Sequence, residues 1–160
     1  MTASASMTAI TYLGVREGLR TELVRHSAID GARALQVVDL VGSGAPDASQ
    51  LARHLDPAVP TVVLSTRRTD LKDATGAIEN ALLKNVPKAV ILRLAPLDLS
   101  IPLLWAWARP TGVLMSSFRP GGTSWIRTSD LAEAVARLDQ DQLDPRAGRA
   151  YDVTGPQVTR

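Results

Sequence analysis

The chain contains no cysteine, and this absence removes several kinds of chemistry. Disulfide bonds, thiolate metal ligands and a cysteine nucleophile are all excluded for its 160 residues. The two histidines, His26 and His54, lie far apart in the sequence. A metal site or a Ser-His-Asp triad would need a third convergent group, and the sequence identifies none. The sequence therefore predicts no metal site and no requirement for an oxidising compartment.

Clustered positive charge, aromatic residues and long apolar runs are also scarce. Aromatic residues make up 4% of the chain, and the net charge is only +2 without a basic block, so no nucleic-acid partner is predicted. The most apolar stretch, 94–115, holds Asp98, Arg109 and three prolines, which makes it a poor membrane span. Residues 1–9 lack the features of a signal peptide. We expect a soluble, cytoplasmic protein without a membrane partner.

The length and the remaining composition are those of one globular domain. Hydrophobic residues make up 45% of the chain and charged residues 21%, both ordinary values. A chain of this length can bury a sizeable core. We expect residues 1–8 to be a disordered N-terminus and residues 9–158 to form a single domain.

Short β-prone runs alternate with amphipathic stretches, which predicts βαβ units and a parallel sheet. Nearly all-apolar runs such as 61–66 suit strands buried on both faces. Asp130, with Glu133 three residues later, is placed to cap the last helix. The fold class is therefore α/β: Rossmann-like, with a mostly parallel sheet flanked by helices. The expected strands cover 9–14, 34–41, 61–66, 89–94, 112–118 and 149–155, and the expected helices cover 17–26, 46–55, 73–85 and 130–138.

Three segments of the C-terminal half follow one another in a recognisable order: 77–97, 123–134 and 148–156. The first ends in ILRLAPL, the second reads TSWIRTSDLAEA and the third reads GRAYDVTGP. Together they resemble the NmrA-like atypical short-chain dehydrogenases/reductases. The resemblance implies a Rossmann fold that binds NADP or NAD and reduces or isomerises a small molecule. Members of that family are normally much longer, so the chain resembles a shortened member.

The cofactor motif of that family is eroded here. Its G-x-x-G-x-x-G pattern lets the backbone approach a pyrophosphate at a helix N-terminus. The corresponding stretch keeps only Gly14 and Gly18, at a different spacing, and Glu17 brings negative charge that Arg16 only partly offsets. Gly14, Arg16 and Gly18 would bind a cofactor only if the chain is a reductase after all. The other interpretation is that Gly14 ends a strand and Gly18 lies in or before a helix.

A proton donor for hydride transfer is missing as well. Many relatives have a lysine where this chain has Thr75, four residues before Glu79. Neither Tyr12 nor Tyr151 is followed by a lysine four residues later, so the Tyr-x-x-x-Lys pair is absent. A reductase usually needs such a group to protonate the product alkoxide. The sequence therefore favours an enzyme that uses no cofactor.

Ligands of open α/β sheets bind outside the carboxyl ends of the strands, and this rule selects the candidate site. Ser65, Thr66 and Asp98 are the candidate catalytic residues. Asp98 lies in an apolar loop, where burial would suit it to acid–base chemistry. The alternatives are that Asp98 caps a short helix near Leu99 and that the polar pair satisfies backbone groups. The candidate substrate-binding residues are Pro96, Leu97, Trp105, Trp107, Trp125 and Arg127.

Three functions remain open at this stage. The first is a non-redox, cofactor-independent cyclase or isomerase acting on a small, largely apolar metabolite in a bacterial biosynthetic pathway. The second is an NAD(P)-dependent oxidoreductase with an unorthodox cofactor site. The third is a non-catalytic binding protein or regulatory dimer. The apolar loop at 99–108 offers a surface to a second copy of the chain, so a homodimer is a further expectation.

Overall fold

A computed structural model describes most of the chain. The described residues are 10–30, 34–41, 51, 53–66, 74–87, 89–98, 101, 106, 109–110, 123–138, 150–155 and 157–158. The expected disordered start and the expected strand at 112–118 lie outside these residues, as do Trp105 and Trp107. The description below refers to the described part of the chain.

Five parallel strands form the main sheet, in the order β1-β2-β3-β4-β6. Each neighbouring pair is parallel, with Tyr12 opposite Val37 and Ser65 opposite Arg93. This confirms the expected Rossmann-like α/β class. The strands are β1 (Ile10–Leu13), β2 (Leu35–Asp39), β3 (Thr61–Thr66), β4 (Val90–Leu94) and β6 (Ala150–Val153).

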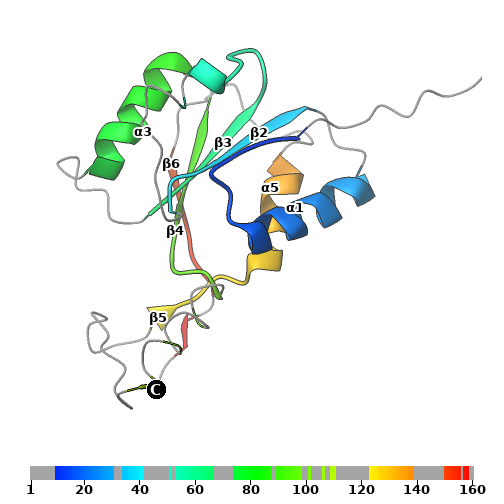
Figure 1. Ribbon diagram of the computed structural model, residues 1–160, viewed down its shortest axis with the longest axis vertical. Coiled ribbons are helices and arrows are strands. Elements are labelled where there is room, and N and C mark those ends of the chain that lie inside the picture. The colour runs from blue at the N-terminus through cyan, green and yellow to red at the C-terminus, as the bar shows by residue number, and fades with distance from the viewer. Residues whose placement is uncertain are drawn as a thin grey trace, which may run out of the picture.

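Among the described residues, helices cover both faces of this sheet. Helices α1 (Glu17–Asp30) and α5 (Thr128–Leu138) lie side by side on one face, and α3 (Ala74–Asn85) covers the other (Figure 1). The apolar runs of β2 and β3 explain this arrangement, because a strand that is apolar on both sides needs cover on both faces. Helices α1 and α5 begin at the carboxyl edge of the sheet (Figure 1).

The core accordingly consists of two apolar clusters, one on each face. Leu19 and Leu23 of α1 pack with Val37 and Leu64 on the α1–α5 face, together with Leu131 of α5. On the opposite face, Leu82 of α3 and Val86, which directly follows the helix, pack with Val38, Val63 and Ile91. Alternate residues of one strand enter opposite clusters, as the two-residue period of a strand requires. Each strand position is thereby assigned to a face.

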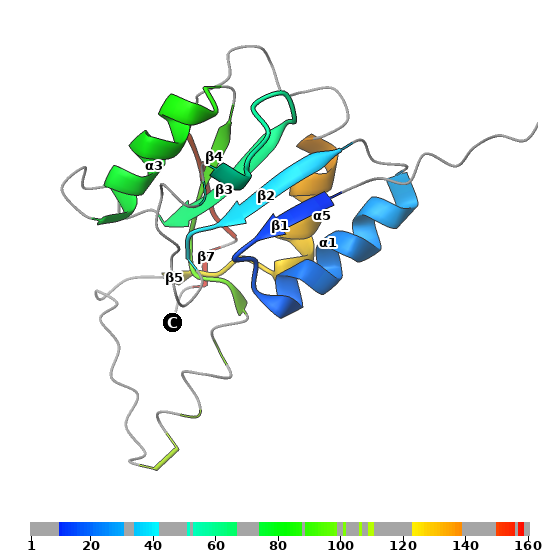
Figure 2. The same ribbon diagram turned by 45° about the horizontal axis from the view of Figure 1, so that its top comes forward.

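Two strand–helix–strand crossovers of the main sheet differ in handedness, which is unusual. The β1–α1–β2 and β3–α3–β4 connections move in the same direction across the sheet but cover opposite faces. They therefore have opposite handedness, whereas about 98% of parallel crossovers are right-handed. In a doubly wound sheet the helices change face where the strand order reverses. Here they change face without a reversal, and β1 lies at one edge of the sheet, beside β2 (Figure 2).

A second group of contacts joins segments of the chain beyond the carboxyl edge of the main sheet. Strands β5 (Thr123–Ser124) and β7 (Gln157–Val158) pair antiparallel, and Leu97 forms a parallel bridge with Ile126. Gly155 lies against the backbone of Trp125, so that a Cβ atom on Gly155 would be 1.6 Å from the Trp125 carbonyl oxygen. A glycine is therefore required at 155 by the close approach of two backbones.

Two helix boundaries differ from the sequence-based expectation. Helix α1 continues to Asp30, past the expected end at His26. Helix α5 begins at Thr128, so Asp130 lies inside its first turn and does not cap it. The expected capping role of Asp130 is therefore wrong. The reason is tertiary, since a residue from another loop caps this helix. No helix among the described residues is long and apolar enough to cross a membrane.

Candidate functional site

The carboxyl edge of the sheet begins with the loop from β1 to α1. Gly14 has a φ of 68°, in the left-handed region where only glycine is unstrained. This turn directs the chain from β1 into α1, which starts at Glu17 and has Gly18 as its second residue. The expectation that Gly14 ends a strand and Gly18 lies in a helix is confirmed.

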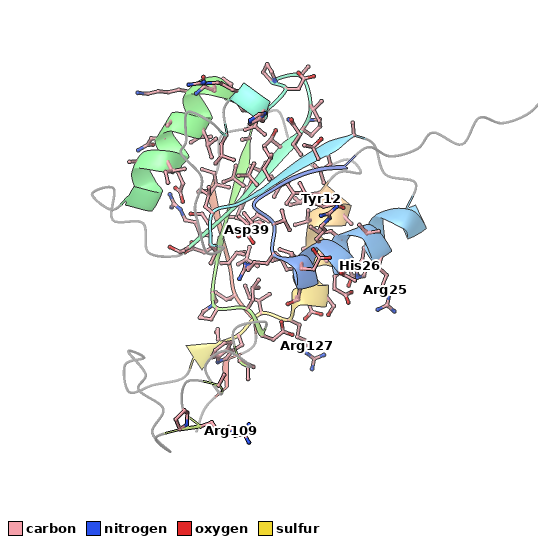
Figure 3. The ribbon with its side chains drawn as sticks, in the orientation of Figure 1. Tyr12, Arg25, His26, Asp39, Arg109 and Arg127 are labelled. Atoms are coloured by element: carbon pink, nitrogen blue, oxygen red, sulfur yellow. The ribbon has the colours of Figure 1, made fainter. Side chains whose placement is uncertain are left out.

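Arg16, in the same loop, reaches across to the end of β2. Its Nε donates to Oδ2 of Asp39 at 2.8 Å, and the backbone N–H of Val41 donates to Oδ1 at 2.9 Å. The side chain of Asp39 is fully buried and that of Arg16 is 23% exposed. Figure 3 shows Asp39 at the end of β2, with Arg25 and His26 further along α1. Both oxygens of Asp39 are thus held by the protein itself.

These residues fit a dinucleotide poorly. In the dinucleotide fold an acidic residue about 20 positions after the glycine loop binds a ribose hydroxyl. Asp39 follows Gly18 by about that interval at the end of the neighbouring strand, but its oxygens are occupied by Arg16 and Val41. The exposed Glu17 adds negative charge to the first turn of α1, where a phosphate would bind.

On the opposite face of the sheet, Ser65, Glu79 and Arg93 form a connected cluster. The hydroxyl of Ser65 donates to Oε1 of Glu79. Nη2 of Arg93 donates to Oε2 of the same carboxylate at 3.0 Å. The side chain of Glu79 is 3% exposed and that of Arg93 is 26% exposed, and Ser65 is fully buried. A hydroxyl, a carboxylate and a cation thus meet at the carboxyl edge of β3 and β4.

Glu79 and Arg93 were not among the site residues predicted from the sequence. Two signals could have found them. Glu79 precedes the core residues Leu82 and Val86 by three and seven positions, which places a carboxylate on the buried face of the helix. Arg93 interrupts the otherwise apolar strand VILRL. A charge on a buried face needs an opposite charge, so the two residues could have been paired.

Asp98 caps a helix, but a different helix from the one considered in the sequence analysis. Its Oδ1 accepts from the backbone N–H of Thr128 at 3.0 Å and from the Thr128 hydroxyl. Thr128 is the first residue of α5. Both of these contacts use Oδ1. The carboxylate therefore ties the loop after β4 to the start of α5.

The other candidate residues are spread around this loop. Leu97 is buried in the core cluster of the α1–α5 face. The carbonyl of Pro96 accepts from Ile126. Trp125 is half-buried, and Arg127 is exposed at the start of α5 (Figure 3).

The remaining candidates do not meet in one place. Thr66, at the end of β3, is half-buried. Trp105 and Trp107 lie outside the described residues. No group of three or more metal-ligating side chains occurs in the described part of the chain.

Comparison with protein-family models finds no match to this chain, and comparison with curated proteins finds none either. The function is therefore inferred from the geometry of the residues themselves.

Proposed function

We propose that this chain is a non-redox, cofactor-independent enzyme of the cyclase or isomerase type. It acts on a small, largely apolar metabolite at the carboxyl edge of β3 and β4. The contact of Ser65 and Arg93 with the buried carboxylate of Glu79 carries this proposal. Reactions that shift a proton need a positioned acid and base, and this cluster supplies both on rigid elements.

The roles follow from the contacts. The carboxylate of Glu79 is the proton acceptor, and the Ser65 hydroxyl, which donates to it, passes the proton between substrate and carboxylate. Arg93 compensates the charge of Glu79 and fixes its orientation. The neighbouring side chains on this face, including Val63, Leu82 and Ile91, are apolar. Such surroundings suit an apolar substrate and strengthen the electrostatic contacts.

The Arg16–Asp39 ion pair supports the absence of a dinucleotide. The pair uses the carboxylate of Asp39, which a ribose hydroxyl would need, and it places the guanidinium of Arg16 at the end of β1. We also infer a relation to the NmrA-like proteins. The change of helix face without a reversal of strand order is the topology expected if a strand–helix unit beyond the outer edge of β1 had been lost. That unit belongs to the half of the fold that binds a nucleotide.

The reductase remains the second candidate, because one observation favours it. Gly14 is in the left-handed conformation directly before α1, as in a phosphate-binding loop. Titration of the protein with NADPH, followed by fluorescence, separates the two candidates. The proposal expects no saturable binding at micromolar concentrations. Micromolar binding would favour the reductase and overturn the cofactor-independent mechanism.

A search for mass-conserving conversions tests the proposed reaction. The protein is incubated with a small-molecule extract from bacterial cells, and the mixture is followed by liquid chromatography and mass spectrometry. A cyclase or isomerase changes the retention of a compound but not its mass. Glu79→Gln keeps the size of the side chain and should abolish the conversion, whereas Glu17→Gln, on the exposed first turn of α1, should not.

Two outcomes would contradict this assignment. Conversions that are equally fast with Glu79→Gln would remove the cluster from the chemistry. Products that gain two hydrogen atoms only in the presence of NADPH would establish a reductase. The folded state of Glu79→Gln is checked by circular dichroism, because the variant leaves Arg93 without its charged partner.

The proposal includes a cytoplasmic setting and a homodimer. Ile101, which belongs to the predicted apolar loop, is 51% exposed, and an exposed apolar side chain of this size suits a contact with a second copy. Sedimentation velocity would detect the dimer. Ile101→Glu should shift the protein toward the monomer, and a wild-type protein that sediments as a monomer at all concentrations would rule the dimer out.

A further inference from the structure

We draw no further inference here: the strongest candidate, the outer edge of the edge strand β1, which among the described residues pairs only with β2 on its inner side, carries nothing, because nothing in the described part of the chain shows what covers it.

Discussion

Arg16 and Asp39 form an ion pair across the carboxyl ends of β1 and β2, with 2.8 Å between Nε and Oδ2. The carboxylate is fully buried, and its other oxygen accepts from the N–H of Val41. A buried carboxylate held in this way fixes the loop between β1 and α1 against β2. The pair therefore has a structural role that can be measured without any substrate.

Removal of one partner of this pair should be costly. Arg16→Met leaves the charge of Asp39 buried without compensation, and it should lower the free energy of unfolding by about 3 kcal/mol. Adding Asp39→Asn removes that charge but keeps an acceptor for Val41, so the double variant should be more stable than Arg16→Met alone. Urea unfolding of the wild type, both single variants and the double variant measures the coupling. Additive effects within about 0.5 kcal/mol would contradict the ion pair.

The cap of α5 gives a prediction that distinguishes two aspartates. Asp98→Ala removes the acceptor for the N–H of Thr128 and should destabilise the protein by about 1–2 kcal/mol. Asp98→Asn keeps an acceptor oxygen and should cost less. Asp130→Ala, in the first turn of α5, should cost only about 0.5 kcal/mol. Thermal unfolding compares the three variants, and a larger loss for Asp130→Ala would mean that the local pattern caps the helix after all.

Two glycines should respond differently to substitution. Gly155→Ala would place a Cβ atom 1.6 Å from the carbonyl oxygen of Trp125, so the backbone must shift, at a cost of at least about 3 kcal/mol. Gly14→Ala meets the strain of a positive φ, about 1–2 kcal/mol. Asparagine tolerates this conformation, so Gly14→Asn should be milder than Gly14→Ala. Gly155→Asn should not be milder than Gly155→Ala, because its Cβ atom meets the same carbonyl oxygen. Chemical denaturation measures all four, and equal losses at 14 and 155 would contradict the close approach.

The raised pKa of Tyr12 predicts that the protein loses stability at high pH. Burial raises the pKa of the Tyr12 hydroxyl above its ordinary 10.0, and the nearby Arg20 offsets part of this effect. The unfolded chain then loses this proton at a lower pH than the folded chain does. The contribution is complete below pH 10 and is lost as the pH rises through the folded pKa. Tyr12→Phe should show a weaker decline than wild type above pH 10 in urea unfolding, and an equal decline would contradict the effect of burial on this hydroxyl.

The sequence predicted the strands and their environment well, for a local physical reason. The apolar runs of β2, β3 and β4 can be buried only between two layers of helices, and this requirement identified a parallel α/β sheet. The amphipathic period of 130–138 likewise predicted the last helix. Whether a residue faces the core depends on its own polarity and on that of its near neighbours in the sequence. Burial can therefore be predicted from the sequence alone.

The tertiary structure alone decided which polar groups form hydrogen bonds and ion pairs with one another. Asp39 bonds to Arg16, which is 23 residues away in the sequence, and Asp98 bonds to Thr128, which is 30 residues away. Glu79 joins Ser65 and Arg93 only because the register of β3 on β4 places these two side by side beneath α3. The sequence determined which residues must be buried. The sheet register and the path of the loops decided how the buried charges are paired, since such pairing depends on positions in space that no local pattern records.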